Sequence, residues 1–169
     1  MACALLAAMA GFTDLRWRRI PNWLTVSGAA IGVALNAGLR GLHGVEDSLL
    51  GLLLGLGILL PFVLVRSLGA GDWKLVGAVG AFLGPRELIV VLFATILVAG
   101  AMALILIVVK GRVRQTLRNC GRMGLALLQF HLPGREVSLD NPEALKVPFG
   151  VAAAIAVVIY AVGHVWRAV

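Results

Sequence analysis

The stretch LIVVLFATILVAGAMALILIVV, residues 88–109, contains no charged side chain. A helix needs about 20 predominantly apolar residues to cross the hydrocarbon core of a bilayer, and this stretch alone is long enough. The rest of the chain has the same character, since 60% of its 169 residues are hydrophobic and 14% are charged. A soluble domain has about 25% charged residues. The sequence therefore predicts an all-α integral membrane protein.

Six hydrophobic segments follow one another along the chain, and they cover residues 1–12, 22–39, 48–65, 73–84, 88–109 and 148–168. The first is short and lacks the charged start of a signal peptide, so it is either a short helix or the end of a helix that begins upstream. The fourth is also short, because Pro85 removes a backbone donor and ends it. We expect a single domain over residues 1–169, a six-transmembrane-helix bundle with short loops and one longer basic cytoplasmic loop.

The positive charges predict the orientation of this bundle. Alternating crossings place residues 13–21, 66–74 and 110–147 on one side, and these segments hold 12 of the 15 Lys and Arg residues. Positive charge favours the cytoplasmic side, so we expect a multi-pass inner-membrane protein with its amino terminus outside. The net charge of +7 is concentrated in loops next to the membrane. We therefore expect contacts with membrane lipids and none with nucleic acid.

Two aspartates, Asp14 and Asp72, stand at the edges of hydrophobic segments on the predicted cytoplasmic side. An ionisable residue at such a place is costly and marks a functional site by default. Each also has a structural interpretation, Asp72 as a helix N-cap after a Gly-Ala-Gly turn and Asp14 as a salt-bridge partner of the arginines that follow it. Together they predict a dyad in which one carboxylate deprotonates water and the other, protonated, polarises a carbonyl group. The pattern assigns neither aspartate to either role.

The residues around Asp72 are candidates for supporting roles in an active-site loop. Gly69 and Gly71 can adopt backbone angles closed to other residues and let a substrate approach closely, although a plain tight turn explains them equally well. Lys74 either biases the charge of the dyad or is an interfacial lysine whose ammonium group reaches water. The cysteines and histidines lack the spacing of metal ligands, so no metal is expected. The residues that bind substrate are not identified by the pattern.

These motifs resemble those of a known family, the prepilin peptidases, which are type IV leader peptidases among the GxGD membrane aspartyl proteases. One signature is Asp14 with the downstream Arg-Arg-Ile-Pro-Asn of residues 18–22, and the second is Gly-Ala-Gly-Asp-Trp-Lys-Leu of residues 69–75. Residues 146–150, Lys-Val-Pro-Phe-Gly, are similar to the stretch that opens the last helix of the family. The resemblance implies catalytic Asp14 and Asp72 near the cytoplasmic membrane surface.

The resemblance also implies an activity and its partners. These are cleavage of the leader from type IV prepilin or pseudopilin precursors after a glycine, no cofactor, and an association with the pilus assembly machinery. Bifunctional members carry a cytoplasmic region with paired Cys-x-x-Cys motifs, which this sequence lacks. It resembles the short, peptidase-only branch of the tight-adherence, or Flp, pilus type, which implies no methyltransferase activity.

A small proton- or ion-coupled membrane transporter, with the aspartates as a cation relay, is the alternative from another functional class. Both carboxyl groups are predicted at one face of the membrane, and none lies at the midplane of the long helices. This placement favours the peptidase over the transporter.

Overall fold

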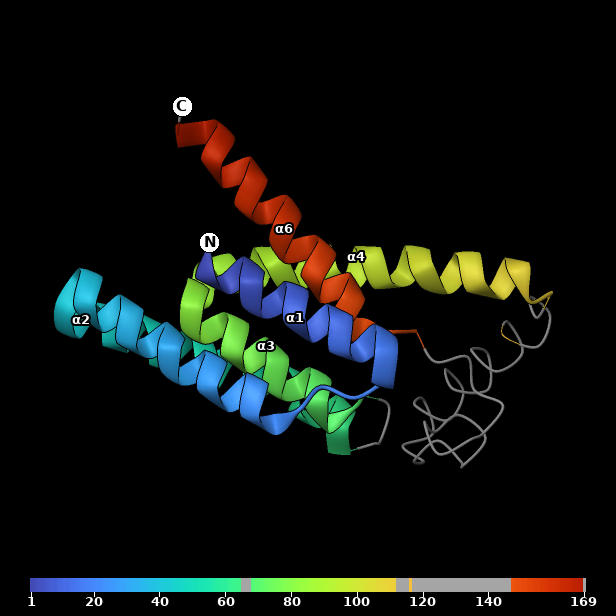
Figure 1. Ribbon diagram of the computed structural model, residues 1–169, viewed down its shortest axis with the longest axis horizontal. Helices are drawn as coiled ribbons and strands as arrows, with labels where there is room; N and C mark the ends of the chain where they lie inside the picture. Colours follow the sequence, from blue (N-terminus) through green and yellow to red (C-terminus); the bar gives the residue numbers. More distant parts are fainter. Residues whose placement is uncertain (65–67, 112–115, 117–146, 169) are drawn as a thin grey trace, which may run out of the picture.

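The structure, a computed structural model, describes residues 1–64, 68–111, 116 and 147–168. Within these residues it contains helices and no strand, as the sequence predicts for the fold class. The helices are α1 (Ala2–Trp17), α2 (Asn22–Leu64), α3 (Ala70–Leu83), α4 (Pro85–Val109) and α6 (Phe149–Ala168) (Figure 1). The predicted basic loop lies almost entirely outside the described residues.

α2 consists of two helical segments that meet at Gly41, whose backbone angles are φ 61° and ψ −140°. These angles lie in a region that is open to glycine and strained for other residues. The structure has two segments here, as the sequence predicts for residues 22–39 and 48–65, but the residues between them are helical except at Gly41. A single glycine suffices to turn the chain, so helix resumes directly after it.

The side-chain amide of Asn36 connects both segments of α2 to the end of α3. It donates hydrogen bonds to Oγ of Ser48 at 2.9 Å and to the carbonyl oxygens of Ala81 and Phe82, each at 3.1 Å. Ser48 is fully buried. Because buried polar groups are costly without partners, these bonds favour one relative placement of the three helical segments.

α3 is the central helix, and all its residues from Leu75 to Ala81 are buried. Its N-cap is Gly69, with ordinary extended angles of φ −70° and ψ 141° and no side-chain capping bond. The alternative structural interpretation of Asp72, as an N-cap after a Gly-Ala-Gly turn, is wrong because Ala70 and Gly71 are already helical. Gly71 packs closely against Ile20, because a Cβ atom added there would lie 3.2 Å from Cβ of Ile20.

Glycines allow the helix backbones around α3 to approach one another closely. A Cβ atom added at Gly55 of α2 would lie 2.9 Å from the carbonyl oxygen of Val76 in α3. A Cβ atom at Gly32, in the first segment of α2, would lie 3.0 Å from the backbone of Ala81. Small residues at helix interfaces are typical of membrane bundles, where van der Waals packing drives association.

Two helices of the described residues, α2 and α4, are long and apolar enough to cross a membrane. α4 also exposes large apolar side chains along much of its length, among them Ile89, Phe93, Ile96, Leu97 and Ile105. An apolar surface of this kind fits contact with lipid. α1, α3 and the apolar part of α6 are shorter than about 20 residues. The predicted count of six membrane spans is therefore not supported.

The packing of α2 on α3 predicts that Gly55→Ala destabilises the protein. The added methyl group meets a backbone oxygen, which cannot rotate away, so we expect the free energy of unfolding to fall by about 1–3 kcal/mol. Thermal unfolding in detergent measures this as a lower Tm. Gly57→Ala is the matched control, because a Cβ atom there meets nothing within 4 Å. Equal Tm changes in the two variants would contradict the packing.

Candidate active site

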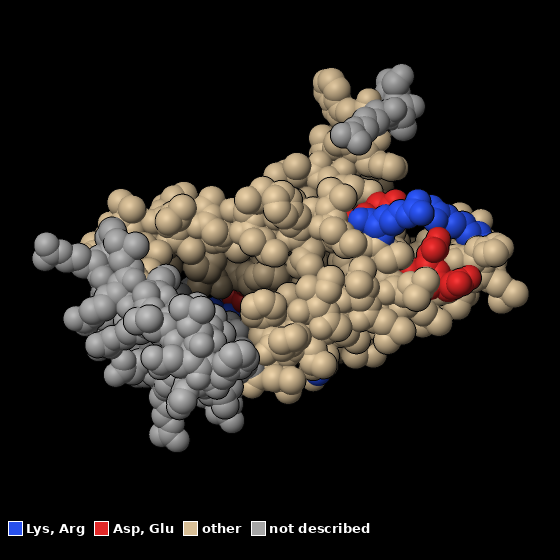
Figure 2. All heavy atoms as spheres, turned by 180° about the vertical axis from the view of Figure 1, so that it is seen from behind, with Lys and Arg blue, Asp and Glu red and all other residues tan. Residues whose placement is uncertain are grey.

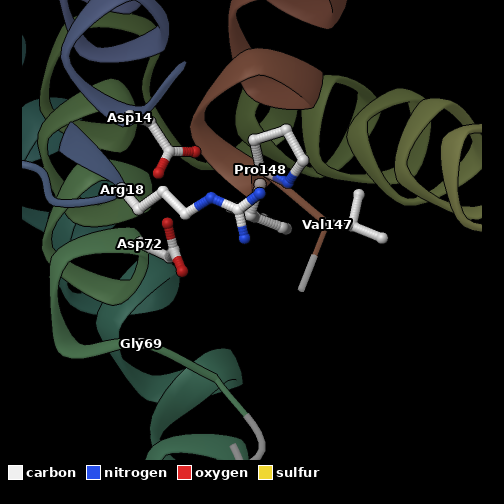
Figure 3. Close-up of a pocket in the computed structure, with 7 residues that line it drawn as sticks. Asp14, Arg18, Gly69, Asp72, Val147 and Pro148 are labelled. Carbon is white, nitrogen blue, oxygen red and sulfur yellow. The ribbon is translucent and has the colours of Figure 1, made fainter. Parts of the chain in front are cut away.

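A cavity of about 220 Å³ lies where the end of α1 meets the starts of α3 and α6. Its lining consists of Asp14, Arg18, Gly69, Asp72, Val147, Pro148 and Phe149 (Figure 3). The two predicted carboxyl groups thus face one space from two different helices. Both lie outside α2 and α4, the helices that are long and apolar enough to cross a membrane.

Asp14 lies in the last turn of α1, and its exposed fraction is 7%. The backbone N–H of Gly150, in the first turn of α6, donates a hydrogen bond of 2.8 Å to Oδ2 of Asp14. Burial raises the pKa of Asp14, whereas backbone hydrogen bonds from Gly150 and Val151 and the positive charge of Arg18 oppose the rise. The ionised form of this buried carboxyl group is therefore stabilised from two directions.

Asp72 lies in the first turn of α3 and is half-buried. Burial, and after it the negative charge of Asp14, raise the pKa of Asp72, and a backbone hydrogen bond at Gly69 opposes this. Two carboxyl groups that act on each other in this way do not both ionise easily. The pair therefore favours a state with one shared proton.

Arg18 was not among the residues predicted for the site. It forms the C-cap of α1 with left-handed angles of φ 50° and ψ 34°, and its N–H donates to the carbonyl oxygen of Asp14 at 2.8 Å. Its side chain extends along the cavity beside the two carboxyl groups (Figure 3). In the sequence nothing distinguishes it from the neighbouring Arg19, because only the end of the helix decides which arginine side chain reaches the cavity.

The start of α6 is the second part of the site that sequence reasoning missed. Residues 148–150, Pro-Phe-Gly, were noted only as a likeness in sequence. Glycine is required at position 150 because an added Cβ atom would lie 2.9 Å from Cβ and 3.0 Å from Oδ2 of Asp14. The likeness was a usable signal, but it did not say which side chain the segment contacts.

Of the two glycines predicted to support Asp72, one lines the cavity and the other does not. Gly69 lines the cavity, and a Cβ atom there would lie 2.8 Å from Oδ2 of Asp72. Gly71 packs against Ile20 and does not line the cavity. Neither glycine has a positive φ, so the structure shows ordinary backbone angles and close packing at both positions.

Lys74 is not part of the cavity lining either. Its Nζ atom donates a hydrogen bond of 3.0 Å to Oδ1 of Asn22, at the start of α2. The pKa of Asp72 responds to burial, Asp14 and Gly69, and Lys74 is not among these causes. Of the two interpretations of Lys74, the structure thus favours a polar contact between helix ends.

The salt-bridge interpretation of Asp14 also fails. In the part of the chain that the structure describes, the pairs of basic and acidic side chains within 4.0 Å are Arg40–Asp47 and His43–Glu46. Asp14 therefore uses its carboxylate for a backbone hydrogen bond rather than a direct ion pair. No group of three His, Cys, Asp or Glu side chains among the described residues is placed to hold a metal ion.

A second, larger cavity of about 490 Å³ lies at the other end of α3. Its lining includes the charged residues Arg40, Asp47, Arg86 and Glu87. Figure 2 shows basic and acidic side chains gathered at one end of the molecule, and few charged side chains elsewhere on the same face. The Arg40–Asp47 pair is 3.6 Å apart and exposed, so this is a solvated network of both signs.

The fold and the first cavity together define the class of protein: an apolar helical protein with two carboxyl groups in one cavity. A family model, that of the type IV leader peptidase family, matches residues 1–104, which include both Asp14 and Asp72. The match covers more than half of the chain, and the chain belongs to this family of membrane proteases of the aspartic type. The family implies prepilin substrates. No curated protein and no solved structure matches the chain.

The position of Lys74 predicts that Lys74→Gln keeps leader-peptidase activity within about threefold of wild type, because partly exposed polar contacts contribute little. The pH dependence of kcat/KM should also be unchanged, since Lys74 bonds to Asn22 and is not among the groups that shift the pKa of Asp72. Cleavage of a prepilin peptide across the pH range measures both quantities. If Lys74→Gln lost tenfold or more of the activity, or if its pH profile were displaced, Lys74 would have a role in the active site.

Proposed function

We propose that this protein is a membrane aspartyl endopeptidase that removes the leader from type IV prepilin-like precursors of the Flp type, with Asp14 and Asp72 acting on one water molecule. One observation carries the proposal. Two carboxyl groups from helices distant in the sequence line the same cavity, and each has a raised pKa. Membership in the leader peptidase family supports the reaction class.

The electrostatics of the cavity suit hydrolysis by two carboxyl groups. One must be ionised to take a proton from water, and the other must be protonated to polarise the scissile carbonyl. Unperturbed aspartates have pKa values of about 3.9 and would both be charged at neutral pH. Burial of both groups and the negative charge beside Asp72 raise the pKa values and so favour retention of one proton.

The size of the cavity supports a substrate with a small residue at the scissile bond. Its volume of about 220 Å³ lies below the range of about 300–1,000 Å³ of typical small-molecule pockets. Val147, Pro148 and Phe149 form an apolar part of its wall. A glycine before the cleaved bond, followed by the hydrophobic pilin helix, fits such a space. In keeping with the short, peptidase-only branch that the sequence resembles, the proposed enzyme releases its product without methylation.

We place the enzyme in the inner membrane with this cavity at the cytoplasmic surface. The bias of 12 to 3 among the basic residues supports this orientation. A cytoplasmic cavity meets the short leader while the hydrophobic helix of the precursor stays in the bilayer. Membrane lipids and the pilus assembly machinery are the further partners of this proposal.

The transporter alternative gains no support from the described residues. A cation relay needs ionisable groups at successive depths along the helices. Besides Asp14, the buried polar side chains of the described residues are Thr25, Ser48 and Thr95. None of the three ionises in the physiological range, so the buried side chains that the structure describes offer no carrier for a relay beyond the cavity.

The proposed dyad predicts that Asp14→Asn and Asp72→Asn each lower leader cleavage by at least about a thousandfold, because asparagine keeps the size of the side chain but cannot carry the proton. Mass spectrometry of a co-expressed Flp-type prepilin measures loss of the leader, and the mature product should carry no added methyl group. Asp47→Asn is the matched control, an exposed aspartate at the other end of the molecule. Near-normal leader cleavage by either Asp14→Asn or Asp72→Asn, with as much of the variant in the membrane as of wild type, would contradict the proposed dyad.

The proposed orientation makes a separate prediction. In a background without Cys3 and Cys120, a cysteine replacing the exposed Arg19 should react with a membrane-impermeant thiol reagent only after permeabilisation. A cysteine replacing His43, whose side chain is 94% exposed, should react in intact cells. Mass-shift gels report both reactions. If position 19 reacted in intact cells and position 43 only after permeabilisation, the cavity would lie at the outer surface. It could not then meet a cytoplasmic leader, and the proposed orientation would be wrong.

A further inference from the structure

The contact between α1 and α6 has a feature that the proposed dyad does not by itself require. The N–H of Gly150 is one of the backbone donors of the first helical turn, which have no acceptor inside their own helix. It donates instead to Oδ2 of Asp14, at 2.8 Å. A carboxylate at a helix N-terminus is also stabilised by the helix dipole. The start of α6 is thus a binding site for the negative charge of Asp14.

Two glycines make this contact possible. Gly150 leaves room for Asp14, since a Cβ atom would lie 2.9 Å from Cβ of the aspartate. Gly11, one turn earlier in α1, lets that helix approach α6 closely. A Cβ atom added at Gly11 would lie 2.9 Å from Cβ of Ala154. The two helices therefore touch at a distance that larger residues would prevent, and the carboxyl group meets the backbone N–H directly.

The charged groups around the cavity act unequally on the two aspartates. Arg18 lines the cavity and lowers the pKa of Asp14, in the same direction as the backbone hydrogen bonds from Gly150 and Val151. Asp72 also lies in a first helical turn, that of α3, but its hydrogen bond at Gly69 is opposed by the charge of Asp14. Of the other cations near these helix ends, Lys74 is bonded to Asn22 and Arg16 lies against Trp17.

We propose that the N-terminus of α6, together with Arg18, holds Asp14 as the carboxylate, so that Asp14 is the base of the dyad and Asp72 carries its proton. This assignment rests on the proposed function. Asp14 takes a proton from water as the water oxygen bonds to the scissile carbon, and Asp72 gives its proton to the carbonyl oxygen. As the C–N bond breaks, Asp14 gives its proton to the leaving amine and Asp72 takes one back from the diol. Both groups then return to their starting states.

Gly150 and Arg18 are positioning residues in this scheme, since they act through Asp14. Removing the positive charge in Arg18→Gln raises the pKa of Asp14 further. The base is then ionised only at higher pH, so the acidic limb of kcat/KM moves upward. We expect the ratio of activities at pH 5.5 and pH 7.5 to fall at least about threefold relative to wild type.

Two matched variants separate charge from other effects of this substitution. Arg18→Lys keeps the charge and should retain the wild-type pH profile. Arg19→Gln removes the same charge from an exposed residue outside the cavity and should also retain it. Gly150→Ala crowds Asp14 away from the N–H and should move the acidic limb upward. An unmoved limb in both Arg18→Gln and Gly150→Ala, with a folded and active enzyme, would overturn the assignment.

Infrared spectroscopy of the purified protein at neutral pH tests the proton directly, without activity. The carbonyl band of a buried protonated carboxyl group should be present in wild type and absent in Asp72→Asn. A band that persists in Asp72→Asn and disappears in Asp14→Asn would reverse the two roles. Failure of wild type to cleave any prepilin would instead count against the proposed function, and the infrared result would still decide which aspartate holds the proton.

Discussion

The close approach of helix backbones is the constraint on which this structure depends. α3 has only 14 residues, and its central part, from Leu75 to Ala81, is buried. It packs between the two segments of α2 because glycines at 32 and 55 of α2 leave no side chain in the way. Lipid offers little hydrophobic drive for helices to associate, so close van der Waals contact has to supply it. This packing sets where α3 begins, and with it the position of Asp72.

The same principle operates a second time at the active site, with an electrostatic consequence. Gly11 and Gly150 bring α1 and α6 together, so a backbone N–H reaches the carboxyl group of Asp14. A buried carboxylate without partners is expensive, and its pKa rises until it holds a proton. The start of α6 and Arg18 oppose this rise at Asp14. Two chemically identical side chains therefore acquire different environments, and different environments are what a dyad needs in order to separate its acid from its base.

The two ends of α3 contrast in a way that fits their different exposure. At one end Asp14 and Asp72 share a small, partly buried cavity, and burial is the main cause of the raised pKa of both carboxyl groups. At the other end Arg40 and Asp47 form an exposed pair beside a larger cavity. In water such charges interact weakly and perturb one another little. Burial, rather than the number of charges, distinguishes the candidate active site from a solvated network.

The sequence by itself determined the helical class, the apolar character and the two aspartates, because composition and local pattern carry that information directly. It also predicted that Pro85 ends the fourth hydrophobic segment, and Pro85 does lie between the end of α3 and the body of α4. Only the tertiary structure decided that α2 turns at a single glycine, that Asp72 lies inside α3 rather than capping it, and that Lys74 bonds to Asn22. The pattern also did not determine that the Arg18 side chain lines the cavity, or that Gly150 bonds to Asp14. These features depend on contacts between residues distant in the chain, and the order of residues along the chain does not specify which helix ends meet.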